Sequence, residues 1–216
     1  MPIEIEKKYH LTSRDRRAIE KRLRELGYQP KPVEFEENTI YRGGNLTFGS
    51  RAMRIRRVNG EAILTFKERI PSNSAIKHQK ENETHISDPD ATHEILMALG
   101  FAPGLIYEKR RTRWQVGKAK LVIDELPFGL FMEIEASERD IKRVEKLIDG
   151  GKLTAVEETY PFLTAHLGKK NRKGIIEARF AKDRRQTSDV RRQTSEVRSQ
   201  KSEVRSQKSV KKNADT

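Results

Sequence analysis

The chain has no cysteine among its 216 residues, which excludes disulfides, cysteine-ligated zinc and thiol catalysis. This absence is compatible with a reducing compartment. No apolar run is long enough to cross a bilayer, and the N-terminus carries no hydrophobic signal segment. Neither a P-loop nor a dinucleotide-type glycine motif stands where it would be needed. We therefore expect a cytoplasmic protein without membrane association.

Positive charge is abundant but unevenly distributed. The chain has 45 Lys and Arg against 32 Asp and Glu. Residues 169–216 hold 16 of the basic residues and 6 of the acidic ones, so residues 1–168 keep 29 and 26. The basic character belongs mostly to the C-terminal segment, and it is a weak argument that the remainder binds nucleic acid.

The sequence predicts one domain over residues 1–168 and a basic low-complexity tail over residues 169–216. From residue 184 the tail repeats a seven-residue unit with one valine in each of the first three copies. A coiled coil needs apolar residues at two positions of every heptad. Since the tail is rich in Arg, Lys, Ser and Gln, we predict that it is disordered and contacts polyanions only non-specifically.

Eight segments of the domain are typical of β-strands. Asn59-Gly60 between two of them is a strong hairpin signal. Helical patterns follow the first, fifth and eighth segments, and a short helix is expected after Tyr160-Pro161. The predicted strands are 2–9, 33–42, 51–58, 61–69, 77–86, 105–116, 119–126 and 130–136. We predict an α+β fold in which a mostly antiparallel sheet closes into a β-barrel, because closure removes unpaired edges.

Charged residues recur at every second position of these strands, beginning with Glu4, Glu6 and Lys8. Such spacing places them on one face. A single charged face would ordinarily be solvated surface, but its recurrence favours the lining of an internal cavity, with the apolar face under the helices. The predicted lining has seven carboxylates and seven bases: Glu4, Glu6, Glu81, Glu83, Asp124, Glu133, Glu135, Lys8, Arg54, Arg56, Lys67, Lys109, Arg111 and Arg113.

This mixture of residue types suggests a ligand that is both anionic and metal-bound. Oxygen ligands suit Mg²⁺ or Mn²⁺ better than zinc or copper. Arginine and lysine suit phosphate oxygens. A nucleotide or inorganic triphosphate carrying a divalent metal would satisfy both groups, and phosphoryl transfer needs mainly positioning and charge stabilisation.

The sequence resembles the CYTH superfamily, the triphosphate tunnel metalloenzymes. Glu4-Ile5-Glu6-Lys7-Lys8 matches the family's E-x-E-x-K signature, and further motifs follow in the family's order over roughly residues 1–168. These are Met53-Arg54-Ile55-Arg56, Leu64-Thr65-Phe66-Lys67, Glu81-Asn82-Glu83, Lys109-Arg110-Arg111, Asp124-Glu125-Leu126-Pro127 and Phe131-Met132-Glu133-Ile134-Glu135. The resemblance implies an eight-stranded antiparallel tunnel. One departure is Gln79, where an arginine is common; Lys77 or Lys80 could compensate.

The resemblance also implies roles for the lining residues. Metal ions would be bound by Glu4, Glu6, Asp124, Glu133 and Glu135, and the triphosphate by Lys8, Arg54, Arg56, Lys67, Lys109 and Arg111, with Arg113 extending the basic set. Glu81 and Glu83 would bind a second metal or orient water; with Lys8 they are the expected catalytic residues.

Three functions stay open at this stage. The leading one is metal-dependent hydrolysis of inorganic or organic triphosphates, such as inorganic triphosphate, ATP or thiamine triphosphate. The second is the class IV adenylate cyclase reaction, which converts ATP to cyclic AMP and pyrophosphate. The third is non-catalytic binding of polyphosphate or nucleic acid. A homodimer is also left open.

Overall fold

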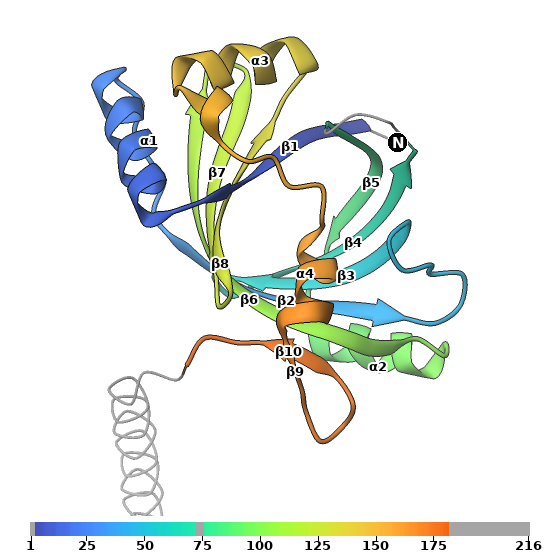
Figure 1. The fold of residues 1–216 in the computed structure, drawn as a ribbon. Coiled ribbons are helices and arrows are strands. Elements are labelled where there is room, and N and C mark those ends of the chain that lie inside the picture. Colours follow the sequence, from blue (N-terminus) through green and yellow to red (C-terminus); the bar gives the residue numbers. More distant parts are fainter. Residues whose placement is uncertain (1–2, 72–75, 182–216) are drawn as a thin grey trace, which may run out of the picture. The chain divides into compact units, whose positions relative to one another are not determined.

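The computed structural model describes residues 3–71 and 76–181, and eight strands form the main sheet (Figure 1). Their observed bounds lie close to the predicted ones. They are β1 (Ile3–Leu11), β2 (Glu34–Arg42), β3 (Arg51–Val58), β4 (Glu61–Ile70), β5 (Lys77–His85), β6 (Ala102–Val116), β7 (Ala119–Leu126) and β8 (Gly129–Glu135).

The eight strands close into an antiparallel barrel, as predicted. Their order is β2-β3-β4-β5-β1-β8-β7-β6, and β2 pairs with β6 to complete the ring. All of these neighbours are antiparallel. Because no strand of the ring lacks a neighbour on either side, the face pointing inward is shared by all eight strands.

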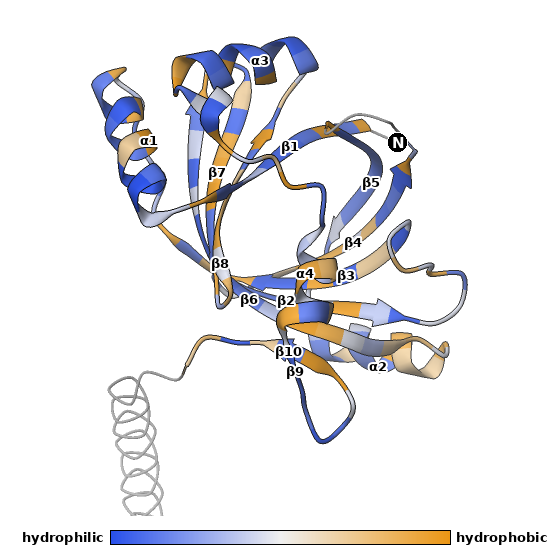
Figure 2. Ribbon diagram, viewed as in Figure 1, coloured by the Kyte–Doolittle hydropathy of each residue, from blue (hydrophilic) through white to orange (hydrophobic). Residues whose placement is uncertain are grey.

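Helices cover the outside of the barrel. The α1 helix (Ser13–Glu25) and α3 (Glu138–Leu147) lie on the β1, β7 and β8 side, and α2 (Pro89–Ala98) lies against β2 and β3 (Figure 1). The largest core cluster joins Ile19 and Leu23 of α1 and Ile141 of α3 to the outer face of the sheet. Along the strands apolar and polar residues alternate (Figure 2), so the apolar face packs under helices and the charged face is left for the interior.

Each of the four α-helices among the described residues begins where the sequence offers a capping side chain. Thr12 forms a reciprocal capping box with Asp15 at the start of α1, and Ser137 accepts a hydrogen bond from the Asp140 amide at the start of α3. A short 3₁₀ helix, Gly150–Lys152, follows α3. The last helix, α4 (Tyr160–Leu167), begins after the N-cap Thr159. No helix within the described ranges is long and apolar enough to cross a membrane.

Sheet pairing continues past residue 168, where the sequence analysis ended the domain. Strands β9 (Lys169–Lys170) and β10 (Ile176–Ala178) form a small hairpin, and β10 pairs in parallel with β6 at Leu105–Tyr107. This part of β6 lies before the segment that pairs with β7, so its edge is available. The compact unit ends at Arg179. The heptad repeats predicted to be disordered lie outside the described residues.

The predicted hairpin turn between β3 and β4 gives a direct test of backbone conformation. Gly60 has φ +82° in open space, whereas Gly151 is equally open without a positive φ. Because an alanine pays about 1 kcal/mol or more for the left-handed region, Gly60→Ala should lower the free energy of unfolding by about that amount. Gly151→Ala is the matched control and should not lower it. Equal effects in urea unfolding would contradict the prediction.

Candidate active site

The interior of the barrel contains a cavity of about 460 Å³. Its lining follows the two-residue period of the strands, which explains why residues far apart in sequence converge on it. On β1 the period gives Glu4, Glu6 and Lys8; the other strands contribute Arg54 and Arg56 (β3), Lys67 (β4), Lys77, Gln79, Glu81 and Glu83 (β5), Tyr107, Lys109, Arg111 and Arg113 (β6), and Glu133 and Glu135 (β8).

Glu4 and Glu81 face each other across β1 and β5, with a lysine between them. Lys67 Nζ lies 2.8 Å from Glu4 Oε2 and 3.1 Å from Glu81 Oε1. Gln79 donates a further hydrogen bond to Glu4. Burial would raise the pKa of Glu4, but the hydrogen bond with Glu81 and the charge of Lys67 lower it to about 2. Burial and the bond to Glu4 raise the pKa of Glu81 to about 8, as expected when two carboxyl groups lie close together.

Glu6 and Glu133 form a second acidic pair on β1 and β8. Burial raises the pKa of Glu6, and the negative charge of Glu133 raises it further. Two buried lysines compensate: Lys8 Nζ lies 3.3 Å from Glu133 Oε1, and Lys77 Nζ lies 3.8 Å from Glu6 Oε1. Burial, together with the charge of Lys8, lowers the pKa of Lys77 to about 8.

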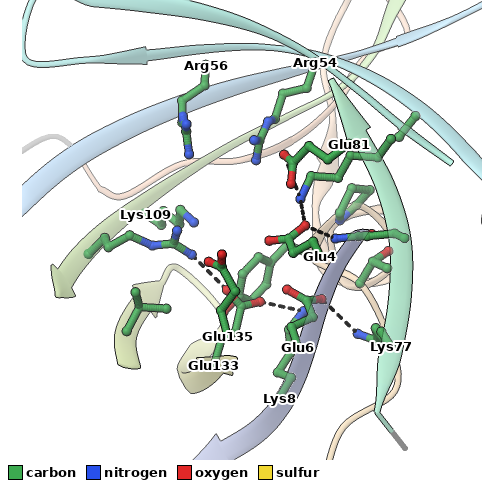
Figure 3. A pocket seen from close by; sticks show the side chains of 18 of the residues that line it. Glu4, Glu6, Lys8, Arg54, Arg56, Lys77, Glu81, Lys109, Glu133 and Glu135 are labelled. Carbon is green, nitrogen blue, oxygen red and sulfur yellow. Dashed lines mark hydrogen bonds and ion pairs between the residues drawn. The ribbon is translucent and has the colours of Figure 1, made fainter. Parts of the chain in front are cut away.

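Two arginines of β3 point into the cavity from the opposite wall (Figure 3). Arg54 and Arg56 reach Glu83 Oε1 at 3.5 and 3.4 Å, and Thr65 Oγ1 donates to the same oxygen at 2.9 Å. The Nε atoms of both arginines are buried without a hydrogen-bond partner. These guanidinium groups therefore retain donor capacity for an anion in the cavity.

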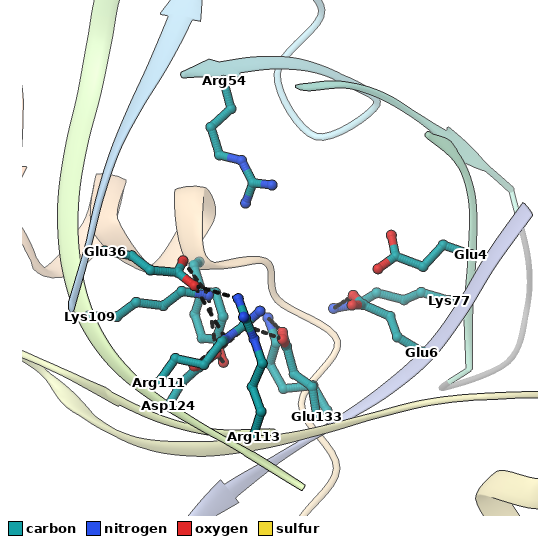
Figure 4. Close-up of polar contacts among 12 residues, drawn as sticks. Glu4, Glu6, Glu36, Arg54, Lys77, Lys109, Arg111, Arg113, Asp124 and Glu133 are labelled. Carbon is teal, nitrogen blue, oxygen red and sulfur yellow. Dashed lines mark hydrogen bonds and ion pairs between the residues drawn. The ribbon is translucent and has the colours of Figure 1, made fainter. Parts of the chain in front are cut away.

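A largely buried ion network supports the β6 side of the cavity (Figure 4). Arg111 donates to both oxygens of Asp124, from Nε at 2.7 Å and from Nη2 at 2.6 Å. Lys109 Nζ lies 3.3 Å from both Asp124 Oδ2 and Glu36 Oε2. Burial alone would raise the pKa of Asp124, but Arg111 and Lys109 hold it well below its usual range. Tyr160 completes the network by donating to Asp124 Oδ2 at 2.9 Å.

The cavity gathers the predicted site residues with one exception, Asp124, which lies beneath Arg111 and has no exposed surface. At the rim, Glu135 pairs with Lys120 at 2.8 Å and Arg113 with Glu34 at 2.6 Å. Lys77, named as a substitute beside Gln79, faces the interior, whereas Lys80 pairs with Glu68.

Two residues of the site, Glu36 and Tyr160, were not predicted from the sequence. The signal for Glu36 was present, because Glu34 and Glu36 have the same two-residue spacing as Glu4 and Glu6. For Tyr160 there was no such signal, since it lies outside the strands at the start of α4.

The donors in the cavity suit a hard divalent cation. Glu4, Glu6, Glu133 and Glu135 offer only carboxylate oxygens, which Mg²⁺ and Mn²⁺ prefer. Burial, and after it the charge of the neighbouring Glu133, raise the pKa of Glu6, as expected where carboxyl groups lie close together. Within residues 3–71 and 76–181 no three such side chains are already gathered for one metal ion; lysines lie against the carboxylates instead. The chemistry fits a metal, which would take the place of these ammonium groups.

Closed topology and a cavity lined by both acidic and basic side chains define a charged tunnel, and comparison with known proteins identifies the family. The model of the CYTH domain matches residues 2–159, so the chain belongs to the CYTH family. The comparison with curated protein sequences found no match.

Solved structures share the fold. The PH1819 protein of Pyrococcus horikoshii is 26% identical with a TM-score of 0.60, and the match covers 76% of this chain and 98% of that one. A provisionally described adenylate cyclase of Vibrio parahaemolyticus is 20% identical with a TM-score of 0.58, over 74% and 95%. HpAC1 of Hippeastrum, a candidate adenylyl cyclase described as having a dominant triphosphatase activity, is 20% identical with a TM-score of 0.51, over 68% and 85%.

Glu36 allows a test of the buried network through acid stability. Burial would raise its pKa, but Lys109 and Arg111 lower it from 4.5 to about 2. A lowered pKa stabilises the folded state above pH 4.5, and this stabilisation is lost as the pH falls from 4.5 to about 2. The shift corresponds to about 3 kcal/mol. Glu36→Gln should therefore destabilise the protein at pH 7, and the difference from wild type should shrink toward pH 2.

The measurement is chemical unfolding at a series of pH values. Exposed Glu61 provides the control, because Glu61→Gln should keep the wild-type loss of stability in acid. A Glu36→Gln difference that stays constant from pH 7 to pH 2 would show that this carboxylate is not held by the two bases.

Proposed function

We propose that the protein is a divalent-metal-dependent triphosphatase, with inorganic triphosphate or an organic triphosphate as substrate. The observation that carries the proposal is the convergence of many carboxylates and many basic groups on one cavity. Carboxylates of β1, β5 and β8 line it together with arginines and lysines of β1, β3, β4, β5 and β6 (Figures 3 and 4), and the two kinds of side chain pair with each other, as Arg111 does with Glu133 at 2.9 Å. A chain of phosphates that carries a metal ion needs both kinds of partner.

The arginines and lysines that line the cavity would bind and orient the phosphate chain. Arg54 and Arg56 have free Nε donors and lie side by side on β3. Arg111 and Lys109 approach from β6, and Lys8 and Lys67 from β1 and β4. Because these groups come from separate strands of one closed sheet, they can contact successive phosphates without rearrangement of the backbone.

The carboxylates that line the cavity would hold the metal and the attacking water. We assign Glu4, Glu6, Glu133 and Glu135 to Mg²⁺ or Mn²⁺, which would neutralise phosphate charge when bound. Asp124 differs from our expectation from the sequence: both of its oxygens already accept hydrogen bonds from Arg111. We assign it to holding Arg111 and Lys109 in place.

Glu81 and Glu83 are assigned to orienting water. Both line the cavity from β5, and Glu83 is fixed by Thr65 at 2.9 Å. Attack of that water on the terminal phosphorus would release orthophosphate and leave a diphosphate, with the developing charge facing Arg54 and Arg56.

The metal assignment is tested by Glu133→Gln combined with Glu135→Gln. The charge that binds the cation is lost while side-chain volume is kept, so metal-dependent phosphate release should fall by on the order of 100-fold or more. The double variant Glu61→Gln with Glu157→Gln, on exposed positions, should keep wild-type turnover. Near-normal rates in the Glu133/Glu135 variant, with an unchanged circular dichroism spectrum, would refute the assignment.

The reaction type is tested with a substrate panel. Purified protein with Mg²⁺ or Mn²⁺ is given inorganic triphosphate, ATP or thiamine triphosphate, and both orthophosphate and cyclic AMP are measured. We expect orthophosphate without cyclic AMP. Cyclic AMP and pyrophosphate from ATP would instead identify a cyclase.

Removal of residues 182–216, the larger part of the basic tail, distinguishes an enzyme from a protein that only binds polyanions. We expect a chain ending at Ala181, which keeps β9 and β10, to turn over triphosphate at the wild-type rate, since no residue assigned to the reaction lies beyond this point. Loss of the main activity on truncation would contradict the proposed site.

A further inference from the structure

The segment between the 3₁₀ helix and α4 runs into the barrel. It is attached to β1 by two backbone hydrogen bonds, from the His10 amide to the Thr154 carbonyl at 3.0 Å and from the Val156 amide to the Lys8 carbonyl at 2.9 Å. These bonds occupy an edge of β1 that β5 leaves free, because β5 pairs only with residues 3–6. The path delivers Thr159 and Tyr160 to the cavity wall.

This segment contacts the buried lysines of the cavity. The Glu158 carbonyl accepts hydrogen bonds from Lys8 Nζ at 3.1 Å and from Lys77 Nζ at 3.4 Å. Lys8 Nζ also lies 3.7 Å from the centre of the Tyr160 ring, and Lys109 Nζ lies 5.2 Å from it. Three ammonium groups from β1, β5 and β6 thus meet Glu158 and Tyr160, two positions that flank the N-cap of α4.

The Tyr160 ring is itself held on several sides. It is 5% exposed, meets the Phe131 ring edge-on at a centroid distance of 5.5 Å, and lies 6.2 Å from the Tyr107 ring. Its hydroxyl donates to Asp124 at 2.9 Å. A ring fixed in this way presents its π-face to Lys8 in one orientation.

We propose that Tyr160 is a positioning residue for substrate binding, which holds the Lys8 ammonium ready for a phosphate oxygen. The family model matches residues 2–159 and so ends one residue before it. The inference rests on the proposed function, since it assumes that Lys8 contacts the triphosphate.

The physical reason lies in what an aromatic ring leaves free. A ring attracts an ammonium group through its quadrupole and uses none of the N–H donors that a phosphate would need. A carboxylate in the same place would compete with phosphate for the charge. Without the ring, Lys8 would retain the Glu158 carbonyl and its charged partner Glu133 at 3.3 Å, and it would lose the contact that draws it toward Tyr160.

Binding of inorganic triphosphate in EDTA tests the proposal, because it reports on the basic groups independently of metal and of turnover. Tyr160→Leu should weaken binding by about tenfold, which lies within the range of cation–π contacts. Tyr160→Phe keeps the ring and should recover most of the lost affinity. Isothermal titration calorimetry gives the dissociation constants, and melting temperatures show whether each variant is folded.

Two further comparisons separate positioning from a general effect on α4. Phe162→Leu changes a ring of the same helix that stacks on Phe48 outside the cavity, so it should bind triphosphate as the wild type does. In a Lys8→Met background, Tyr160→Leu should remove little additional affinity, because its partner is already gone. If Tyr160→Leu fails to fold, Tyr160→Met replaces it with an unbranched side chain without a π-face.

The outcomes distinguish this inference from the proposed function. If wild-type protein binds triphosphate only when Mg²⁺ is present, the same variants are compared by their KM for triphosphate with Mg²⁺. Wild-type protein that binds no triphosphate with or without Mg²⁺ would overturn the proposed function. Wild-type binding that is unchanged by Tyr160→Leu, matched in its loss by Phe162→Leu, or reduced equally in the Lys8→Met background would overturn the role of Tyr160 alone.

Discussion

Matching of opposite charges inside a closed barrel is the constraint on which the rest of the structure depends. Ionised groups as buried as Asp124, Glu36 and Lys109 are costly unless each has a close partner. The barrel supplies these partners from different strands: Arg111 and Lys109 of β6 for Asp124 of β7, and Lys109 again for Glu36 of β2. Closure is what makes this possible, because an open sheet would leave β2 and β6 at opposite edges.

The period of two residues made most of the fold and the lining predictable. Alternation is a local property of a strand, so Glu4 and Glu6, or Arg54 and Arg56, can be assigned to one face without knowing the neighbouring strands. The Asn59-Gly60 turn was equally local, and both residues adopt the positive φ that such a hairpin requires. The two-residue strand β9 and three-residue strand β10 are too short to show a period, and so were not predicted.

The sequence pattern predicts which side chains face the interior of the barrel. It does not predict which of them reach the cavity. Asp124 faces inward as predicted, yet its oxygens accept hydrogen bonds from Arg111 and Tyr160. That depends on side-chain lengths across three elements, which no single strand pattern contains. Tyr160 illustrates the other half of the problem, because its place is set by the path of the connection after α3 rather than by any periodic signal.

The pairing of lysines with carboxylates in the cavity has a consequence for how ligands would bind. Lys67 lies between Glu4 and Glu81, and Lys8 lies against Glu133. A metal ion alone would have to displace these ammonium groups, and a triphosphate alone would face the carboxylates. When both enter together, the carboxylates exchange lysine for metal and the lysines exchange carboxylate for phosphate, so every buried charge keeps a partner. Under the proposed function, the same charge matching that stabilises the barrel would therefore favour a metal–triphosphate complex over either component.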